Sequence, residues 1–152
     1  MTLEDLGSTL RKAAVDLGVA VDFGPLGMMP RADPLVPGLY AGVGRILYPE
    51  GRSGRRLWRR ACGTMIYIKP GAYTDLPADI RAYAASNTAF PHDSTMNQFF
   101  KESQFESYRT LGSHVVARIL GQDGGTPTMA TMRRRVSRYI RAMTPGPSKG
   151  QR

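Results

Sequence analysis

The residues best suited to acid–base chemistry are the two histidines, His92 and His114. His92 precedes Asp93 and Ser94, so its imidazole could serve as a general base beside a carboxyl and a hydroxyl group. The alternative is that His92 lies at the entry to a helix and hydrogen-bonds backbone groups near the helix cap. We favour this structural interpretation because no nucleophile or second base accompanies His92, and we interpret His114 in the same way.

Metal and cofactor chemistry finds little support in the sequence. The two histidines and the single cysteine, Cys62, do not have the spacing of metal ligands, and one cysteine excludes an internal disulfide. We therefore expect no metal site, no cofactor and no catalytic residue in this chain.

Arginine is concentrated in two clusters. The net charge is +9, and arginine supplies 17 of the 21 basic residues. The first cluster is Arg52, Arg55, Arg56, Arg59 and Arg60, with Trp58 among them, and the second is Arg133, Arg134, Arg135, Arg138 and Arg141. Clustered cations with an aromatic residue suit a membrane interface or a phosphate backbone. We predict contacts with anionic lipid through Arg55, Arg56, Trp58, Arg59, Arg60, Arg134, Arg138 and Arg141.

Both clusters also have an interpretation without a ligand. The first cluster is also typical of a solvated arm in a long hairpin connection, and we favour this interpretation for it. For the second cluster two arrangements are open. The final helix could lie on an anionic membrane with its apolar face down, or it could pack on its own domain with its arginines in solvent.

The stretch from residue 90 to 112, FPHDSTMNQFFKESQFESYRTLG, is the densest in unusual residues. Its apolar periodicity predicts a helix from about Ser94 to Leu120, and Thr95 and Gln98 have the spacing of a capping box. The aromatic side chains of this helix could line a groove for an acyl chain, but we expect them in the core. They are Phe99, Phe100, Phe105 and Tyr108.

The polar residues of the same stretch suggest a contact with another domain. Arg109 can form a bidentate pair with a carboxylate of that domain, or it can pair with Glu106 three residues earlier. We predict the domain contact at His92, Gln98, Glu102, Gln104, Glu106 and Arg109.

This stretch resembles the C-terminal region of bacterial patatin-like phospholipases, a family of serine lipid acyl hydrolases. The matching residues are Phe90, Pro91, His92, Ser94, Thr95, Gln98, Phe99, Phe100, Glu102, Gln104, Phe105, Glu106, Tyr108, Arg109, Leu111 and Gly112. The segments LEDLGSTLRKAAVDLGVAVDF, GRILYPEG and IYIKP extend the resemblance over about residues 3–116. It is a resemblance to the end of those proteins and not to their catalytic core.

The catalytic motifs that the resemblance implies are missing. No Gly-x-Ser-x-Gly is present to hold a serine nucleophile, and the glycines of Gly51–Gly54 have the wrong spacing. Asp123–Gly125 has the Asp-Gly-Gly letters of the family's base partner, but it lies beyond the resemblance and between two expected helices. The family's glycine-rich oxyanion loop is missing too, so we expect the chain to be inactive by itself.

The remaining elements predict an α+β fold, a small antiparallel sheet covered by about four helices. We expect a helix over residues 2–17, closed by Gly18 in the left-handed region, then a short strand over 19–23. A β-hairpin joins strands 39–48 and about 62–68, with Gly42 and Gly44 marking a bulge or a close backbone approach. Helices follow over 77–87 and 129–143. We divide the chain into a patatin-like C-terminal region, 1–120, and a basic amphipathic helix with a disordered tail, 121–152.

Two functions follow as hypotheses. The chain is the non-catalytic C-terminal part of a patatin-like hydrolase, a fragment or a truncated relative, and braces the catalytic domain in cis or as a separate chain. Alternatively, it is a free-standing basic module that binds anionic lipid or, with less support, nucleic acid, for which no motif is present. The acidic start and the lack of a long apolar window predict a cytoplasmic protein, with peripheral contact at the inner membrane as a further option.

Overall fold

The chain folds into four helices and one three-stranded antiparallel sheet within the residues that the structure, a computed structural model, describes. These residues are 4–24, 26, 38–49, 62–94, 96–121 and 125–144. The predicted α+β class is thereby confirmed. The elements in order are α1 (Glu4–Leu17), β1 (Ala20–Phe23), β2 (Ala41–Leu47), β3 (Cys62–Ile68), α2 (Ala78–Ser86), α3 (Glu102–Leu120) and α4 (Met129–Met143).

The sheet has the order β1-β2-β3 and contains the expected hairpin. Strand β2 pairs with β3 from Ala41 opposite Ile68 to Leu47 opposite Cys62, without interruption. Because the register is continuous, the predicted bulge is absent. The alternative of a close approach is right at Gly44, where an added Cβ would come within 2.9 Å of the Phe23 ring on β1.

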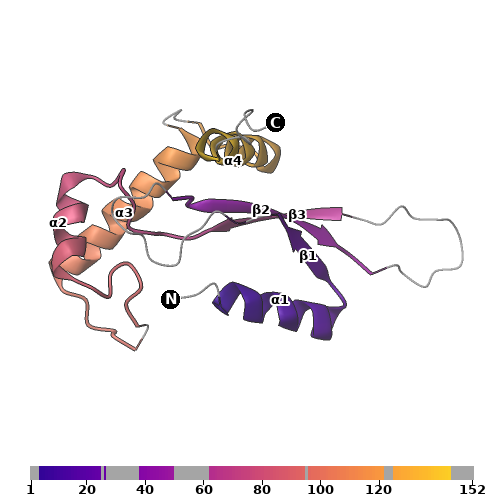
Figure 1. Ribbon diagram of the computed structural model, residues 1–152, viewed down its shortest axis with the longest axis horizontal. Helices are drawn as coiled ribbons and strands as arrows, with labels where there is room; N and C mark the ends of the chain where they lie inside the picture. The colour runs from indigo at the N-terminus through magenta and orange to yellow at the C-terminus, as the bar shows by residue number, and fades with distance from the viewer. Residues whose placement is uncertain are drawn as a thin grey trace, which may run out of the picture.

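The sheet lies between two helices (Figure 1). Helix α1 covers one face and α4 the other, while α3 runs from α4 towards α2 beyond one end of the sheet. Helix α1 ends at Gly18, whose φ of 65° is the predicted left-handed cap. The chain turns there, and the Val19 N–H donates to the Ala13 carbonyl oxygen at 3.2 Å. This turn brings β1 alongside β2.

The core lies where α2, α3 and α4 meet the start of β2. Leu111, Val115 and Ile119 recur every four residues on α3, so they form one buried stripe. Helix α4 contributes Val136 and Tyr139, and the Tyr139 hydroxyl accepts a hydrogen bond from the Tyr40 backbone N–H at 3.1 Å. Helix α4 is therefore an integral part of this core, although the sequence analysis assigned it to a separate segment from residue 121.

One carboxylate joins three parts of the fold. Asp75 lies in the turn before α2, and its Oδ1 accepts a hydrogen bond from the Tyr40 hydroxyl at 2.7 Å. Its Oδ2 accepts from Arg118 Nε on α3 at 2.7 Å and lies 3.5 Å from His114 Nε2. Burial, followed by this hydrogen bond, raises the pKa of Tyr40 above its ordinary value, so the hydroxyl remains a donor. We call Asp75, Tyr40, Arg118 and His114 the Asp75 hub.

Replacing Asp75 should destabilise the protein. In Asp75→Ala the fully buried Tyr40 hydroxyl and the Arg118 guanidinium lose their acceptor. A buried polar group without a partner costs about 1–3 kcal/mol, so urea unfolding should show a loss of that size. The exposed Asp16→Asn on α1 is the control and should change stability by less than about 0.5 kcal/mol. Equal stability of Asp75→Ala and the wild type would show that the hub does not hold these elements together.

Candidate functional site

The predicted central helix is shorter than expected, and its start is displaced. Helix α3 begins at Glu102 instead of Ser94. The Ser94 hydroxyl accepts from the Met96 N–H at 3.2 Å, and the Ser94 carbonyl oxygen accepts from the Asn97 N–H at 3.0 Å. These bonds close a local turn, a conformation that serine side chains favour in competition with a helix. Thr95, the expected cap, lies outside the described residues.

Several large apolar side chains before α3 and in its first turn fall outside the core. The exposed fractions are 89% for Met96, 93% for Phe99, 53% for Phe100 and 63% for Phe105. We call these four residues the aromatic patch. The expectation that Phe99, Phe100 and Phe105 are core residues is wrong. Tyr108 is half-buried and packs against the core.

The aromatic patch adjoins the core through the contact between the rings of Phe100 and Tyr108, whose centroids are 6.4 Å apart. Phe90 is buried and contacts the rings of Tyr83 and Tyr108, with centroid distances of 5.1 and 4.9 Å. The Tyr108 hydroxyl donates to Asp93 Oδ2 at 2.6 Å and accepts from the Asp93 N–H at 3.3 Å. A cavity of about 230 Å³ lies here, with Phe100 and Phe105 among its lining residues. The segment before α3 is thus tied to α3 at its base.

The residues predicted for a domain contact have different surroundings. Gln98 and Glu102 are exposed beside the aromatic patch, whereas Gln104 is buried and cannot reach a partner domain. Arg109 pairs with Glu106 through two hydrogen bonds, with Nε at 2.8 Å from Oε2. This pairing lowers the pKa of Glu106. The predicted Glu106–Arg109 pair is confirmed.

His92 is half-buried in the turn that enters this segment. Its backbone N–H donates to the Ala89 carbonyl oxygen at 2.7 Å. The residue also lines a cavity of about 280 Å³ together with Phe90 and Pro91. The position of His92 in a tight turn agrees with the structural interpretation of this residue.

A second surface is a groove between α4 and the sheet. Its volume is about 730 Å³, and Val43, Gly44 and Gly63 lie on the sheet side. Five arginines line it together with one carboxylate, that of Asp22. We call it the arginine groove, and its arginines are Arg45, Arg133, Arg134, Arg138 and Arg141.

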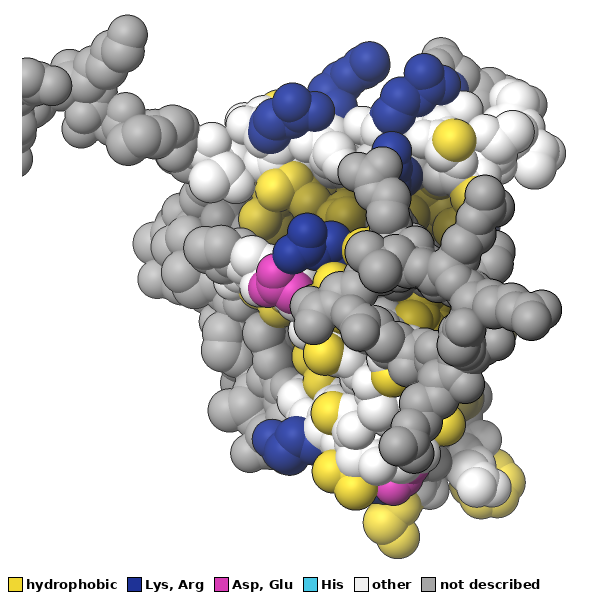
Figure 2. All heavy atoms as spheres, turned by 90° about the vertical axis from the view of Figure 1, so that its right-hand side faces the viewer, with side chains coloured by type: hydrophobic (Ala, Val, Ile, Leu, Met, Phe, Trp, Pro, Cys, Tyr) yellow, Lys and Arg dark blue, Asp and Glu magenta, His cyan; other side chains and the backbone are white. Residues whose placement is uncertain are grey.

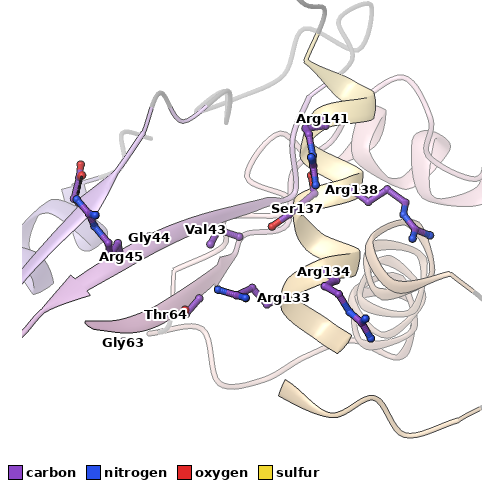
Figure 3. A pocket seen from close by; sticks show the side chains of 11 residues that line it. Val43, Gly44, Arg45, Gly63, Thr64, Arg133, Arg134, Ser137, Arg138 and Arg141 are labelled. Atoms are coloured by element: carbon purple, nitrogen blue, oxygen red, sulfur yellow. Dashed lines mark hydrogen bonds and ion pairs between the residues drawn. The ribbon is translucent and has the colours of Figure 1, made fainter. Parts of the chain in front are cut away.

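The arginines reach the groove from two elements (Figure 3). Arg133, Ser137 and Arg141 recur every four residues and form one row along α4. Arg133 extends from this row towards Thr64 on β3, while Arg134 and Arg138 point away from the sheet. Arg45 lies across the groove on β2.

Most of these charges lack a carboxylate partner. Arg45 lies 3.7 Å from Asp22, and both side chains are largely exposed, so the pair is weak. Among the residues the structure describes, no carboxylate pairs with the guanidinium of Arg133, Arg134, Arg138 or Arg141. Helix α4 itself contains no acidic residue.

The arrangement of α4 decides between the two interpretations of the second arginine cluster. Val136 and Tyr139 are buried, and Met132, Ile140 and Met143 pack against the same core. The apolar face is thus already covered by β2 and α3, so the interpretation that α4 lies apolar face down on a membrane is wrong. The alternative, a cationic helix packed on its own domain, is right.

The sequence placed Arg133 in the second cluster but not among the predicted contact residues, and it gave no indication that Arg45, Thr64 and Ser137 line the same groove. The spacing of Arg133, Ser137 and Arg141 was a visible signal of a shared helix face. No local pattern connects them to Arg45 and Thr64, because the register of β2 with β3 and the packing of α4 bring these residues together. The first arginine cluster, with Arg55, Arg56, Trp58, Arg59 and Arg60, and also Asp123 and Gly124, lie outside the described residues.

In the described ranges, no three side chains of His, Cys, Asp or Glu come together to hold a metal ion. No helix in this part of the chain is long and apolar enough to cross a membrane.

Stability should fall at alkaline pH in a way that depends on Tyr108. Burial, followed by the hydrogen bond to Asp93, raises the pKa of Tyr108 from 10.0 to about 12. A raised pKa stabilises the fold fully below the ordinary value, and this contribution is lost as the pH rises from 10.0 towards 12. Urea unfolding across this range should show the loss, and Tyr108→Phe should make it shallower.

Ultraviolet titration gives an independent check. Asp93→Asn removes the negative charge beside the hydroxyl and should move the Tyr108 titration back towards 10.0. An identical pH dependence in the wild type and both variants would contradict the coupling of Tyr108 to Asp93.

Among the described residues, the aromatic patch is exposed and apolar, and the arginine groove is lined mainly by cationic side chains. Comparisons of the chain with models of protein families, with curated proteins and with solved structures find no match.

Proposed function

We propose that this chain is the non-catalytic C-terminal part of a patatin-like lipid acyl hydrolase, in which the aromatic patch docks on the catalytic domain. The observation that carries the proposal is the exposure of Met96, Phe99, Phe100 and Phe105 within the stretch of closest resemblance. Exposed groups of aromatic side chains are typical of protein interfaces, where such residues contribute most of the binding energy. The docking partner belongs to the same polypeptide or is a separate chain.

The surroundings of the patch have the composition of an interface rim. Gln98, Lys101 and Glu102 are exposed beside it and can bind polar groups at the edge of a buried contact. Arg109 is satisfied by Glu106, so this pair stabilises α3 itself. We therefore assign the contact to the patch and its rim, without Gln104, and not to Arg109.

The lack of a catalytic set supports a non-catalytic role. The sequence has no Gly-x-Ser-x-Gly to hold a serine nucleophile, and His114 lies beside the carboxylate of Asp75, with Nε2 at 3.5 Å from Oδ2. In the Asp75 hub, one carboxylate oxygen accepts a hydrogen bond from Tyr40 and the other accepts one from Arg118. The hub has the character of a structural brace.

Cross-linking in the source cells tests the docking directly, because a lysine lies next to the patch. Lys101 is exposed beside Phe100, and Lys12 is exposed on α1. An amine-reactive cross-linker followed by mass spectrometry should join Lys101, but not Lys12, to a domain that contains Gly-x-Ser-x-Gly. An immunoblot then shows whether that domain shares the polypeptide, by a mass far above 16.7 kDa.

Variants separate docking from folding. Phe99→Ser and Phe105→Ser remove exposed rings, so stability should change by less than about 0.5 kcal/mol. Each should reduce docking, and hence the Lys101 cross-link, by about tenfold, the effect of an interface residue contributing at least ~1.4 kcal/mol. The matched controls, Val15→Ser and Leu17→Ser, remove exposed apolar groups on α1 and should leave the cross-link intact. A native polypeptide of about 16.7 kDa with no Lys101 cross-link to such a domain would refute the proposal.

A further inference from the structure

We propose that the arginine groove binds the phosphate headgroup of an anionic phospholipid, with the adjoining acyl chain in the apolar end of the same groove. This site is distinct from the aromatic patch, and the inference does not depend on the proposed docking. The groove is lined by cationic side chains and adjoins an apolar cavity.

The cationic end has the donors that a phosphate needs. Arg133 and Arg141 lie in one row on α4, and Arg45 lies opposite on β2. Guanidinium groups bind phosphate oxygens through two parallel hydrogen bonds. The hydroxyls of Thr64 and Ser137 line the same cavity and can complete the set of donors. One carboxylate, Asp22, lines the groove and faces Arg45 at 3.7 Å.

The charge on α4 is a local conflict that an anion would relieve. Like charges that are neighbours on a helix surface destabilise it by about 0.2–0.5 kcal/mol per pair, and Arg141, in the row that lines the groove, follows Arg138 by three residues. Helix α4 has five arginines and no acidic residue to offset them. Arg135 has a structural role, because its Nη1 donates to the Leu120 carbonyl oxygen at 2.7 Å near the end of α3. Arg134 donates one hydrogen bond to the Thr131 hydroxyl at 3.3 Å, and Arg141 Nε donates to the Ser137 carbonyl oxygen at 3.2 Å. Both keep further N–H groups that face the groove or solvent, as do Arg133 and Arg138.

The groove continues into an apolar cavity. This second cavity of about 270 Å³ shares Val43, Ser137 and Arg141 with the arginine groove, and Leu39, Ala41 and Ile140 line its far part. Figure 2 shows apolar side chains recessed beneath the cationic side chains at the top of the molecule, where α4 lies. Cationic groups beside an apolar recess match a phosphate that is joined to an acyl chain.

The composition of the lining favours lipid over nucleic acid. Proteins that bind single-stranded nucleic acids combine a basic groove with aromatic side chains on which the bases stack. No aromatic side chain is among the described residues that line either cavity. The apolar recess offers aliphatic contacts, which suit an acyl chain.

Vesicle binding tests the inference. The protein should bind vesicles of phosphatidylcholine mixed with phosphatidylglycerol and should not bind vesicles of phosphatidylcholine alone. Each arginine near an anionic surface contributes about 1 kcal/mol, so Arg133→Gln and Arg141→Gln should each weaken binding about fivefold. Arg11→Gln, which removes an exposed arginine from α1 on the opposite side of the sheet, should leave binding unchanged.

A variant that keeps every charge distinguishes binding of the lipid inside the groove from nonspecific electrostatic attraction between the protein and the vesicle surface. Thr64 is exposed on β3 and lines the groove, so Thr64→Phe fills it with a residue that strands tolerate well. Circular dichroism and thermal unfolding confirm that each variant is folded. Thr64→Phe should weaken vesicle binding at least as much as the loss of one arginine.

Several outcomes would overturn the inference. One is an equal loss of binding in Arg11→Gln and Arg133→Gln with no loss in Thr64→Phe, which indicates only diffuse charge. A second is binding of glycerol 1-phosphate without binding of the mixed vesicles, which indicates a soluble phosphate ester. A third is preferential binding of a single-stranded RNA oligonucleotide over the vesicles.

Discussion

The arrangement of the helices depends on the hydrogen bonds that the carboxylate of Asp75 accepts. This carboxylate accepts hydrogen bonds from a fully buried tyrosine hydroxyl at the start of β2 and from an arginine on α3, which lies 43 residues further along the chain. A buried hydroxyl needs such an acceptor, because an unpaired polar group in the interior is costly. The turn before α2, the start of the central strand β2 and α3 are thus held in one relative position.

The position of α3 then determines that of α4. The stripe of Leu111, Val115 and Ile119 packs with Val136, and the Tyr139 hydroxyl accepts a hydrogen bond from the backbone N–H of Tyr40. With its apolar face covered in this way, α4 presents its arginines beside the sheet and to solvent. The arginine groove is therefore a consequence of core packing.

In the described part of the chain, both candidate surfaces depart from the usual placement of apolar and charged residues. Four large apolar side chains are exposed before and at the start of α3, and arginines crowd one helix without carboxylates in it. Natural proteins tolerate local conflicts of this kind mainly where function requires them. An apolar conflict is relieved by another protein surface and a cationic conflict by an anion, which is why we assign different partners to the two surfaces.

The sequence by itself determined the elements of this protein. Periodicity of two and of 3.6 residues located the hairpin and the helices α1, α2 and α4, and Gly18 marked the end of α1, because these features depend on neighbours within a few residues. The start of α3 was misjudged, since the spacing of Phe99 and Phe100 imitates a helical face, whereas the chain forms a local turn at Ser94 and α3 begins only at Glu102. Only the tertiary structure decided that Phe99 is exposed, that Gln104 is buried, and that Arg45 faces the arginines of α4. The physical reason is that burial and long-range pairing depend on contacts between residues that are distant in the chain, and no local pattern specifies them.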